Sequence, residues 1–409
     1  MPILFSVILL SESKMILVTR PSARLCCAFR TQLPKTRHCV SRCCQTTTKL
    51  TSRINSALVR THSAPLIDHG HQDLLCYRQT RHYSSGHSLL CCPLSNRTLV
   101  KIKGRDSSNF LQGLITNDMR LLTTQQPAMY TMMLNVQGRV LYDMIIYVLP
   151  PEDEESVFLM ECDKQLATEL VQTMNRYKIR KKITMVIVED EYKIWAVLPP
   201  DVVMDNKPLS VTLNKEKAAI ISVPDPRLPP FGHRVITKQD HTVSDVLGGS
   251  HVMCDEKTYD KRRYIVGLSE GPLDLPPGNC TPLESNALFL NGVSFFKGCY
   301  IGQELTARTH HTGVIRKRLM PVIIHGDSTL LKPGMTIENN KAKNCGKFRN
   351  SVDSNGLALL RLQEAIGKDK LVAKNEAGEK TVDVEASVPW WWPTDSDEII
   401  KQILTTLNK

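Results

Sequence analysis

The sequence predicts an α+β fold in which antiparallel strands carry the core, followed by a small all-β domain. Three observations support this prediction. Before residue 200 there are several short strand-like runs, and in one of them, 98–103, apolar and polar residues alternate as in a half-buried strand. One longer stretch in the same region has its apolar residues at helical spacing. After Gly313 only short β-type runs remain, separated by Gly, Pro, Asn and Asp.

Strand-like runs and turn residues place most elements of the α+β part. The expected strands are 98–103, 128–134, 140–149, 156–161, 183–188 and 192–198. Asp106 or Ser107 can cap a short helix after the first strand. The apolar residues that this helix buries are Phe110, Leu111 and Leu114. Gly138 supplies the conformational freedom for a turn, so the second and third strands are expected to form a hairpin.

Two further helices are expected. In 164–180 the apolar side chains lie on one helical face; they are Leu166, Leu170, Met174 and Tyr177. The other helical stretch falls near 250–267, after the irregular, proline-rich segment 224–230. This order of strands, helices and hairpins favours antiparallel pairing in an α+β domain.

The C-terminal domain is expected to be a small β-barrel or sandwich. Its predicted strands are 319–324, 357–362, 370–373 and 381–388. Trp390, Trp391 and Trp392 follow them. A capping helix is then expected over 394–409, with apolar residues Ile399, Ile400, Ile403, Leu404 and Leu407.

The formal net charge of +11 is concentrated at one end of the chain. Residues 1–100 hold 13 Lys and Arg against three acidic residues, whereas the other 309 residues hold 39 basic and 38 acidic ones. Such a nearly neutral body gives no reason to expect nucleic-acid binding. The longest apolar runs are too short for a membrane-spanning helix, so membrane insertion is not expected either.

The basic N-terminal region has the composition of a mitochondrial transit peptide. Residues 13–67 contain ten basic residues and no acidic one, with abundant Ser, Thr and Arg. Residues 81–85, R-H-Y-S-S, resemble the Arg-x-Tyr-Ser pattern that the matrix processing peptidase favours. We therefore expect a leader over 1–83, cleavage after Tyr83 and residence in the mitochondrial matrix. The alternative is a disordered basic segment with another role.

Most cysteines lie in the N-terminal part of the chain. Eight of the 13 precede residue 93, and the five beyond it are Cys162, Cys254, Cys280, Cys299 and Cys345. None of these five belongs to a C-x-x-C pair, which argues against a structural zinc site and against a cluster held by four cysteines of this chain. Their wide spacing fits a reducing compartment. We expect no metal that the chain holds on its own.

The most informative segment is 297–304, K-G-C-Y-I-G-Q-E. It resembles the K-G-C-Y-x-G-Q-E signature of the YgfZ family, which belongs to a superfamily with the glycine-cleavage T-protein, an aminomethyltransferase. Other segments agree with the superfamily in the same order along the chain; they are 110–113 with 116–118, 135–143, 225–228 and 282–286. The resemblance runs from about residue 95 to 390.

This resemblance implies a three-lobed fold. Two α+β lobes surround a central folate-type cavity, and a C-terminal β-barrel follows. The first lobe is expected to be discontinuous, 95–185 with 250–312, and to carry the signature. The second lobe is expected over 186–249 and the barrel over 313–393.

The resemblance also implies a function. With the leader, it points to a mitochondrial iron–sulfur cluster assembly factor of the YgfZ family, needed by four-iron enzymes such as aconitase and by the lipoate pathway. The implied partners are A-type iron–sulfur carrier proteins and the client four-iron enzymes. The implied cofactor is tetrahydrofolate. A cluster would be bound only transiently, together with a partner.

Cys299 is the candidate catalytic thiolate or cluster contact. A single thiolate can complete an iron site that another protein mainly supplies, but it cannot hold a four-iron cluster alone. Lys297 and Arg308 can favour the thiolate electrostatically. The alternative is that Cys299 is a buried small hydrophobe in a glycine-rich turn.

The rest of the signature surrounds this cysteine; its residues are Lys297, Gly298, Tyr300, Gly302, Gln303 and Glu304. The two glycines allow close backbone approach or unusual dihedral angles. The amide of Gln303 and the carboxylate of Glu304 can bind a folate ring or orient a partner.

Four residues outside the signature are expected to contact folate: Asn117, Asp118, Asp143 and Arg263. For the first two, the alternative is a turn or cap after a helix. For Asp143 it is a strand-end carboxylate. Arg263 can clamp the anionic tail of the folate, or it belongs to a solvated run of charges, 261–263.

Residue 142 discriminates between an assembly factor and an enzyme. T-proteins generally carry two adjacent carboxylates after the hairpin glycines, and one of them acts on the folate nitrogen. Here the pair is Tyr142 and Asp143, and a tyrosine is too weak an acid to replace the first carboxylate at neutral pH. We therefore expect no classical enzyme. The alternatives are a folate-dependent aminomethyltransferase and a plain folate-binding or structural protein.

Overall fold

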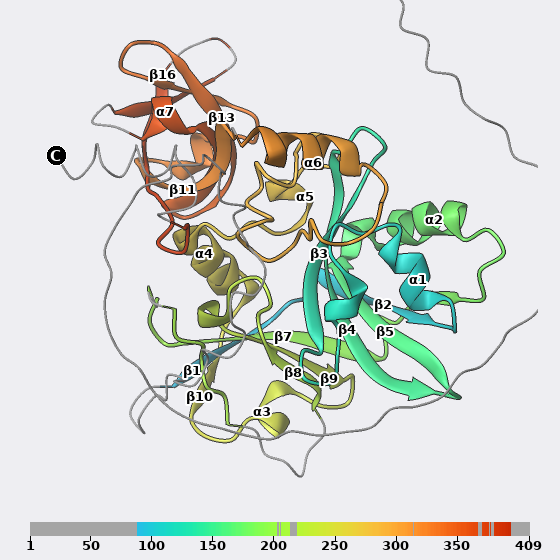
Figure 1. Ribbon diagram of the computed structural model, residues 1–409. Coiled ribbons are helices and arrows are strands. Elements are labelled where there is room, and N and C mark those ends of the chain that lie inside the picture. Colours follow the sequence, from blue (N-terminus) through green and yellow to red (C-terminus); the bar gives the residue numbers. More distant parts are fainter. Residues whose placement is uncertain are drawn as a thin grey trace, which may run out of the picture. The chain divides into compact units, whose positions relative to one another are not determined.

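The computed structural model describes residues 88–393, apart from 203, 205, 213–218, 314, 367–369, 376 and 378–379. The expected leader with its cleavage position at Tyr83, and the expected helix over 394–409, lie outside the described residues. Within them, two five-stranded sheets and a closed six-stranded barrel form the framework (Figure 1). The predicted α+β class and the C-terminal barrel are confirmed.

The first sheet has the strand order β3-β4-β5-β2-β6, and all its pairs are antiparallel. Its strands are β2 (Arg97–Lys103), β3 (Ala128–Leu134), β4 (Val140–Glu152), β5 (Glu155–Asp163) and β6 (Thr184–Ile187). Helices α1 (Ser107–Gln112) and α2 (Ala167–Tyr177) cover one face (Figure 1). Leu170 and Met174 of the predicted helical face are buried there, whereas Tyr177 at the helix end is 40% exposed. The predicted β3–β4 hairpin is confirmed.

Asp106 precedes α1 as predicted, but its side chain does not cap the helix. Its carboxylate instead accepts a hydrogen bond from the backbone N–H of Lys182 at 2.7 Å. Asp106 therefore connects the start of α1 to the segment before β6. Short 3-10 helices η1 (Met119–Leu121) and η2 (Lys164–Leu166) complete this region.

The second sheet has the order β10-β1-β7-β9-β8. Its strands are β1 (Leu89–Pro93), β7 (Tyr192–Leu198), β8 (Ala219–Pro224), β9 (His233–Lys238) and β10 (His251–Met253), with η3 (Pro229–Phe231) and α3 (Val243–Val246) in its connections. Strands β1 and β10 join it from outside the expected range 186–249, and they pair in parallel. Cys91 and Cys92 are buried in β1, which lies before the expected first lobe. The described residues hold seven free cysteines.

Three helices connect the sheets to the barrel: α4 (Glu256–Val266), α5 (Gly271–Asp274) and α6 (Gln303–Thr312). The helix expected near 250–267 begins later than predicted, because β10 occupies its first residues. The Asp255 side chain accepts a hydrogen bond from the Thr258 N–H and so fixes the true start of α4. At its other end, Gly267 has φ +79°, and a Cβ there would lie 2.9 Å from Pro321 of the barrel.

The barrel closes in the order β11-β14-β13-β12-β15-β16. Its elements are β11 (Lys317–His325), η4 (Ser328–Leu330), β12 (Thr336–Asn339), β13 (Asn344–Val352), β14 (Asn355–Arg361), α7 (Leu362–Ala365), β15 (Leu371–Lys374) and β16 (Lys380–Ala386). Strands β12 and β13 were not predicted. Their sequences are largely polar and include Gly346, whose φ of +152° interrupts the alternation.

One apolar core contacts both sheets, α4 and the start of the barrel, and a separate core fills the barrel. Figure 1 shows α4 between the second sheet and the barrel. In the described part of the chain, no helix has the length and apolar character needed to cross a membrane.

Candidate functional site

The signature segment 297–304 leads into α6 and lies against two loops of the first sheet. One is the segment that follows α1, and the other is the 135–138 turn between β3 and β4. Cys299 is solvent-exposed in this position. The alternative of a buried small hydrophobe is therefore wrong, and the thiol is accessible to another macromolecule.

Lys297 points into the protein and is buried. Its ammonium group donates hydrogen bonds to the carbonyl oxygens of Gln112, Ile115 and Asn117, at 2.7, 2.6 and 2.8 Å. Burial lowers the pKa of Lys297 to about 8. An ammonium has three N–H groups, and in Lys297 all three donate to carbonyl oxygens. Lys297 therefore holds the backbone in place and does not activate the neighbouring thiol.

Arg308 was the second expected activator, and it is an exposed residue of α6. Its guanidinium lies 3.8 Å from the carboxylate of Glu304 one turn earlier, and the Glu304 side chain is 92% exposed. This arrangement is a solvated pair on a helix surface. Gln303 has an internal role instead, because its side-chain oxygen accepts a hydrogen bond from the Tyr300 N–H at 3.3 Å.

The loop before Cys299 is held at several more points. The N–H groups of Ser294 and Ile301 donate to carbonyl oxygens of the segment around α1 at 3.0 and 3.2 Å. The guanidinium of Arg120 donates to the Phe296 carbonyl at 3.4 Å. The Phe295 ring stacks on His310 of α6, with ring centroids 3.8 Å apart. These contacts fix the loop on both sides of the exposed thiol.

The two signature glycines differ in what they require. Gly302 has φ +77°, and a Cβ there would lie 2.3 Å from the carbonyl oxygen of Asn135. Gly138, in the facing turn, is equally restricted, because a Cβ on it would lie 2.8 Å from the Gly302 carbonyl oxygen. Gly298 has no atom within 4 Å of its Cβ position. Close backbone approach is thus confirmed at Gly302 and absent at Gly298.

Asn117 and Asp118 are buried, but their side chains hold the local backbone. The Asn117 amide donates to the carbonyl oxygens of Tyr130 and Asn291 at 2.8 and 2.6 Å. The Asp118 carboxylate binds the Arg120 guanidinium at 2.6 Å, and hydrogen bonding to Arg120 lowers the pKa of Asp118 to about 2. Asp118 also caps η1. Both residues thus have the structural role of a turn or cap that was the alternative to folate binding.

Arg263 is buried and already paired. Its guanidinium donates to the carboxylates of Asp260 and Asp274 at 2.6 and 2.7 Å, and to the Leu268 carbonyl at 3.0 Å. It is neither a solvated charge nor a free anion clamp. An anionic ligand at Arg263 would have to displace two carboxylates.

Tyr142 and Asp143 point to opposite faces of β4, as adjacent strand residues do. Tyr142 packs under α1 and α2 and donates to Glu169 at 3.1 Å, and burial raises the pKa of Tyr142 to about 12. One Asp143 oxygen accepts from the Gly271 N–H at 3.1 Å. The other lies 3.8 Å from Arg97 and has no hydrogen-bond partner among the described residues.

A network of buried charges between the two sheets was not anticipated from the sequence. Its members are Arg97, Glu161, Asp225, Arg227, Arg234 and Glu270. Glu270 accepts from Arg227 and Arg234 at 2.7 and 2.6 Å, and Arg234 also lies 3.7 Å from Glu161. Segment 225–228 was noted only as a match. Its Arg227 pairs with a residue 43 positions away, which no local pattern reveals.

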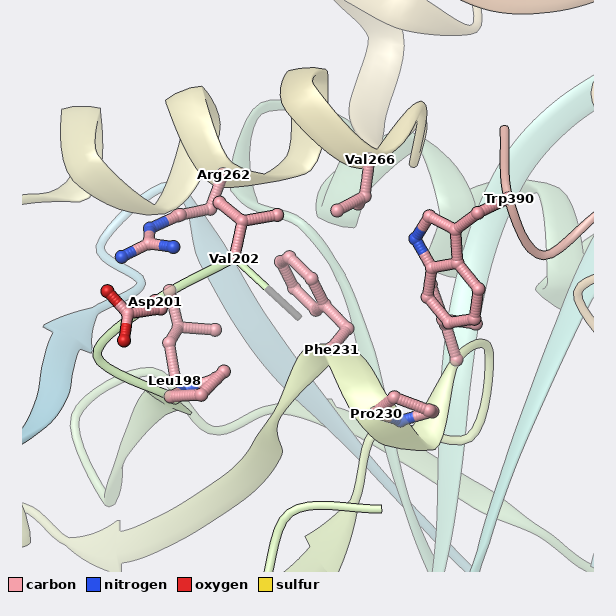
Figure 2. Close-up of a pocket in the computed structure, with 10 residues that line it drawn as sticks. Leu198, Asp201, Val202, Pro230, Phe231, Arg262, Val266 and Trp390 are labelled. Carbon is pink, nitrogen blue, oxygen red and sulfur yellow. The ribbon is translucent and has the colours of Figure 1, made fainter. Parts of the chain in front are cut away.

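A groove lies between the loop after β7, η3, α4 and the end of the barrel (Figure 2). Phe231 and Trp390 contribute aromatic rings to it, and Arg262 stands at the end away from Trp390 (Figure 2). The remaining lining residues are Leu198, Pro199, Asp201, Val202, Leu228, Pro230 and Val266. The Trp390 indole N–H is buried and has no hydrogen-bond partner among the described residues. None of the four expected folate contacts lines this groove.

Over the same described residues, no group of three or more His, Cys, Asp or Glu side chains is arranged to hold a metal ion. Cys299 therefore belongs to no such group among these residues.

Comparisons with known proteins agree with this picture. Residues 316–394 match the family model described as CAF17, C-terminal beta-barrel domain. The human protein named "Iron-sulfur cluster assembly factor IBA57, mitochondrial" is 42% identical over 322 residues, a match that covers 76% of this chain and 88% of that protein. The Neurospora crassa protein named as its homolog is 33% identical over 402 residues, covering 82% and 90%.

A solved structure supports the fold. The glycine cleavage system aminomethyltransferase T from Bartonella henselae superposes with a TM-score of 0.55 at 14% identity, covering 75% of this chain and 87% of that one. At this identity the likeness concerns the fold alone. It confirms the T-protein-like fold that the signature implied.

Proposed function

The chain belongs to the family of mitochondrial iron–sulfur cluster assembly factors IBA57, and on that premise we propose that it matures four-iron clusters in the mitochondrial matrix, with Cys299 as the cluster contact. The observation that carries this proposal is the exposed thiol on a loop held at several points. A thiolate is the ligand that iron–sulfur clusters favour.

The proposed step treats the cluster as cargo. An A-type carrier protein supplies the cluster and most of its ligands. The Cys299 thiol releases its proton to solvent, and the thiolate donates an electron pair to one iron, which loses a weaker ligand. That iron–sulfur bond breaks again when the cluster passes to a client four-iron enzyme. One exposed thiol suits transient binding of this kind better than storage.

The aminomethyltransferase alternative has little support at the hairpin. Tyr142 stands where the first carboxylate would be, and its phenol is buried and bonded to Glu169. With a pKa of about 12, this phenol stays protonated at neutral pH. A proton transfer to or from a folate nitrogen needs a group that titrates nearer the working pH.

We further propose that tetrahydrofolate binds in the groove of Figure 2 rather than at Asn117, Asp118 and Arg263. Asn117, Asp118 and Arg263 already use their polar groups within the protein. The groove offers aromatic rings from Phe231 and Trp390 and an unpartnered indole N–H. The Arg262 guanidinium at its end donates to the Pro200 carbonyl oxygen, so a folate carboxylate would have to replace that contact. The free volume of about 10 Å³ is the size of one water molecule, so folate binding requires the groove to open.

Reduced folate titrated into the protein, with tryptophan fluorescence as the readout, tests this second proposal. We expect saturable binding that Arg262→Gln weakens about tenfold, the usual effect of losing a charged contact. The matched control is Arg308→Gln, an exposed arginine that does not line the groove, which should leave binding unchanged. Absence of saturable binding at millimolar folate would rule the groove out as a folate site.

Cells that express only one variant test the assembly role. We expect Cys299→Ser and Cys299→Ala to lower mitochondrial aconitase activity to the level seen without the protein, since a hydroxyl or methyl group is a poor iron ligand. Cys254→Ala, at a partly exposed cysteine in another region, should support full activity. Normal aconitase activity with Cys299→Ala would remove the thiol from the mechanism.

A further inference from the structure

Phe296, three residues before the exposed thiol, is an unusual surface residue. Its side chain is 75% exposed, and no other phenylalanine or tryptophan of the described residues is exposed. An aromatic ring in water forgoes the stabilisation that its burial would give, roughly 1.5–3 kcal/mol. Single exposed aliphatic residues are common, but an exposed aromatic ring beside a functional group marks a contact site.

The backbone under this ring is held in place. The Phe296 carbonyl accepts from Arg120, and Arg120 is itself fixed by Asp118 at 2.6 Å. On either side, Phe295 stacks on His310 and Lys297 is clamped by three carbonyls. The ring therefore lies on a preformed loop. Little conformational entropy of this loop is lost when a partner buries the ring.

A second apolar side chain lies on the neighbouring turn. Val136 is 71% exposed at the tip of the β3–β4 hairpin. Gly138, two residues further along this hairpin, lies close to Gly302 and Leu305 at the start of α6. The exposed guanidinium of Arg120 is already paired with Asp118, and that of Arg308 lies near Glu304. Apolar contact is thus the stronger attraction that this surface offers.

We propose that Phe296 is the anchor of a docking surface for the cluster-carrying protein. The partner would be a protein that holds an iron–sulfur cluster with one replaceable ligand next to an apolar pocket. Burial of the Phe296 ring in that pocket would place the cluster within reach of Cys299. The inference rests on the proposed function and adds a positioning residue to it.

The experiment measures the affinity of purified A-type carrier, apo and cluster-loaded, for the full chain and its variants. We expect Phe296→Ser to weaken apo-carrier binding about 10- to 100-fold, the range for an aromatic hot spot. Ile179→Ser is the matched control, because Ile179 is 76% exposed on another part of the first sheet's lobe; it should change binding less than twofold. Phe296→Leu should restore part of the affinity.

Cys299→Ser separates this inference from the proposed function. It should leave apo-carrier binding unchanged while abolishing the change in the cluster's visible absorption on mixing. If Phe296→Ser and Ile179→Ser bind apo carrier equally well, the docking inference is wrong, and the absorption change with wild type still supports the cluster contact. If Phe296→Ser instead only dissolves a dimer of this chain, the surface serves self-association and the inference is likewise overturned.

Discussion

Cys299 and Lys297 lie two residues apart and have opposite surroundings. The thiol is exposed, whereas the ammonium group is buried and bound to three carbonyl oxygens. One residue offers a ligand to a partner, and the other fixes the loop that presents it. At the scale of single residues, this division predicts different consequences for substitutions at the two positions.

Substitution of Cys299 should not affect stability. Because the side chain is exposed, Cys299→Ala and Cys299→Ser are expected to change the free energy of unfolding by less than about 0.5 kcal/mol. Cys162→Ser places a hydroxyl in the core, where Cys162 is 1% exposed, and should cost about 1–3 kcal/mol. Urea unfolding of the three variants measures both. A large loss of stability with Cys299→Ala would mean that the cysteine is a packing residue.

Lys297 should titrate near pH 8. Burial lowers its pKa to about 8, below the roughly 10.4 of an unfolded lysine. Between these values the unfolded chain holds the extra proton, so this group's contribution to the free energy of unfolding rises with pH. Once Lys297 has lost its proton, its neutral amine has only two N–H groups, so one of the three carbonyl oxygens loses its hydrogen bond. NMR titration of labelled lysine Cε signals should show one inflection near pH 8, absent in Lys297→Met; none below pH 9.5 would contradict the burial argument.

At the scale of elements, the start of α6 depends on its contact with the β3–β4 turn. Gly302 and Gly138 bring the two backbones together, and a side chain on either would collide with the other. The contact fixes the end of the signature, and the backbone bonds of Ser294 and Ile301 fix the rest. The position of the exposed thiol is thus determined by the first sheet.

Alanine at the two signature glycines should have unequal effects. Gly302→Ala requires φ +77° and places a Cβ 2.3 Å from the Asn135 carbonyl oxygen, so we expect a loss of at least about 2 kcal/mol in the free energy of unfolding. Gly298→Ala meets no atom within 4 Å and should be nearly neutral. Thermal melts of both variants decide this. Equal melting temperatures would show that the turn does not need the glycine at 302.

Elements with a regular pattern were predictable, and those fixed by distant contacts were not. The hairpin at Gly138 follows from local turn chemistry, and its strands β3 and β4 were predicted within a few residues. Strand β1 was missed because it lies before the resemblance begins, at about residue 95. Strands β12 and β13 were missed because barrel closure, not alternation, holds their polar sequences.

The site shows the same limit. Cys299 and segment 297–304 could be named as candidates from the sequence because the signature is contiguous, whereas the exposure of Cys299 could not be predicted. The internal partners of Asn117 and Arg263, which are Asn291 and Asp274, could not be predicted, because a single sequence does not show which polar groups a fold pairs.

At the scale of the whole molecule, the buried charge network joins the two sheets. Glu270 accepts from two arginines and from the hydroxyl group of Tyr259, which donates at 2.7 Å. Burial alone would raise the pKa of Glu270, but Arg234 and Arg227 hold it well below its usual value. A carboxyl group with a depressed pKa stabilises the fold above its unfolded pKa, and this stabilisation is lost as pH falls.

Removal of the Glu270 charge should strongly destabilise the protein. Glu270→Gln leaves two buried guanidinium groups with less compensation, so we expect a loss of about 3–5 kcal/mol. Glu304→Gln, whose side chain is 92% exposed, is the control and should have little effect. Urea unfolding at neutral pH measures both variants. A Glu270→Gln protein as stable as wild type would show that the network does not hold the sheets together.

The central claim, that Cys299 contacts a cluster carried by another protein, is tested most directly by anaerobic reconstitution. Full chain and cluster-loaded A-type carrier are mixed, and visible absorption and circular dichroism follow the cluster while gel filtration follows the complex. We predict a complex that contains both proteins and the cluster, with a changed spectrum for wild type and an unchanged carrier spectrum for Cys299→Ser. The same spectral change with Cys299→Ser, or a stable cluster on the isolated chain, would contradict the account.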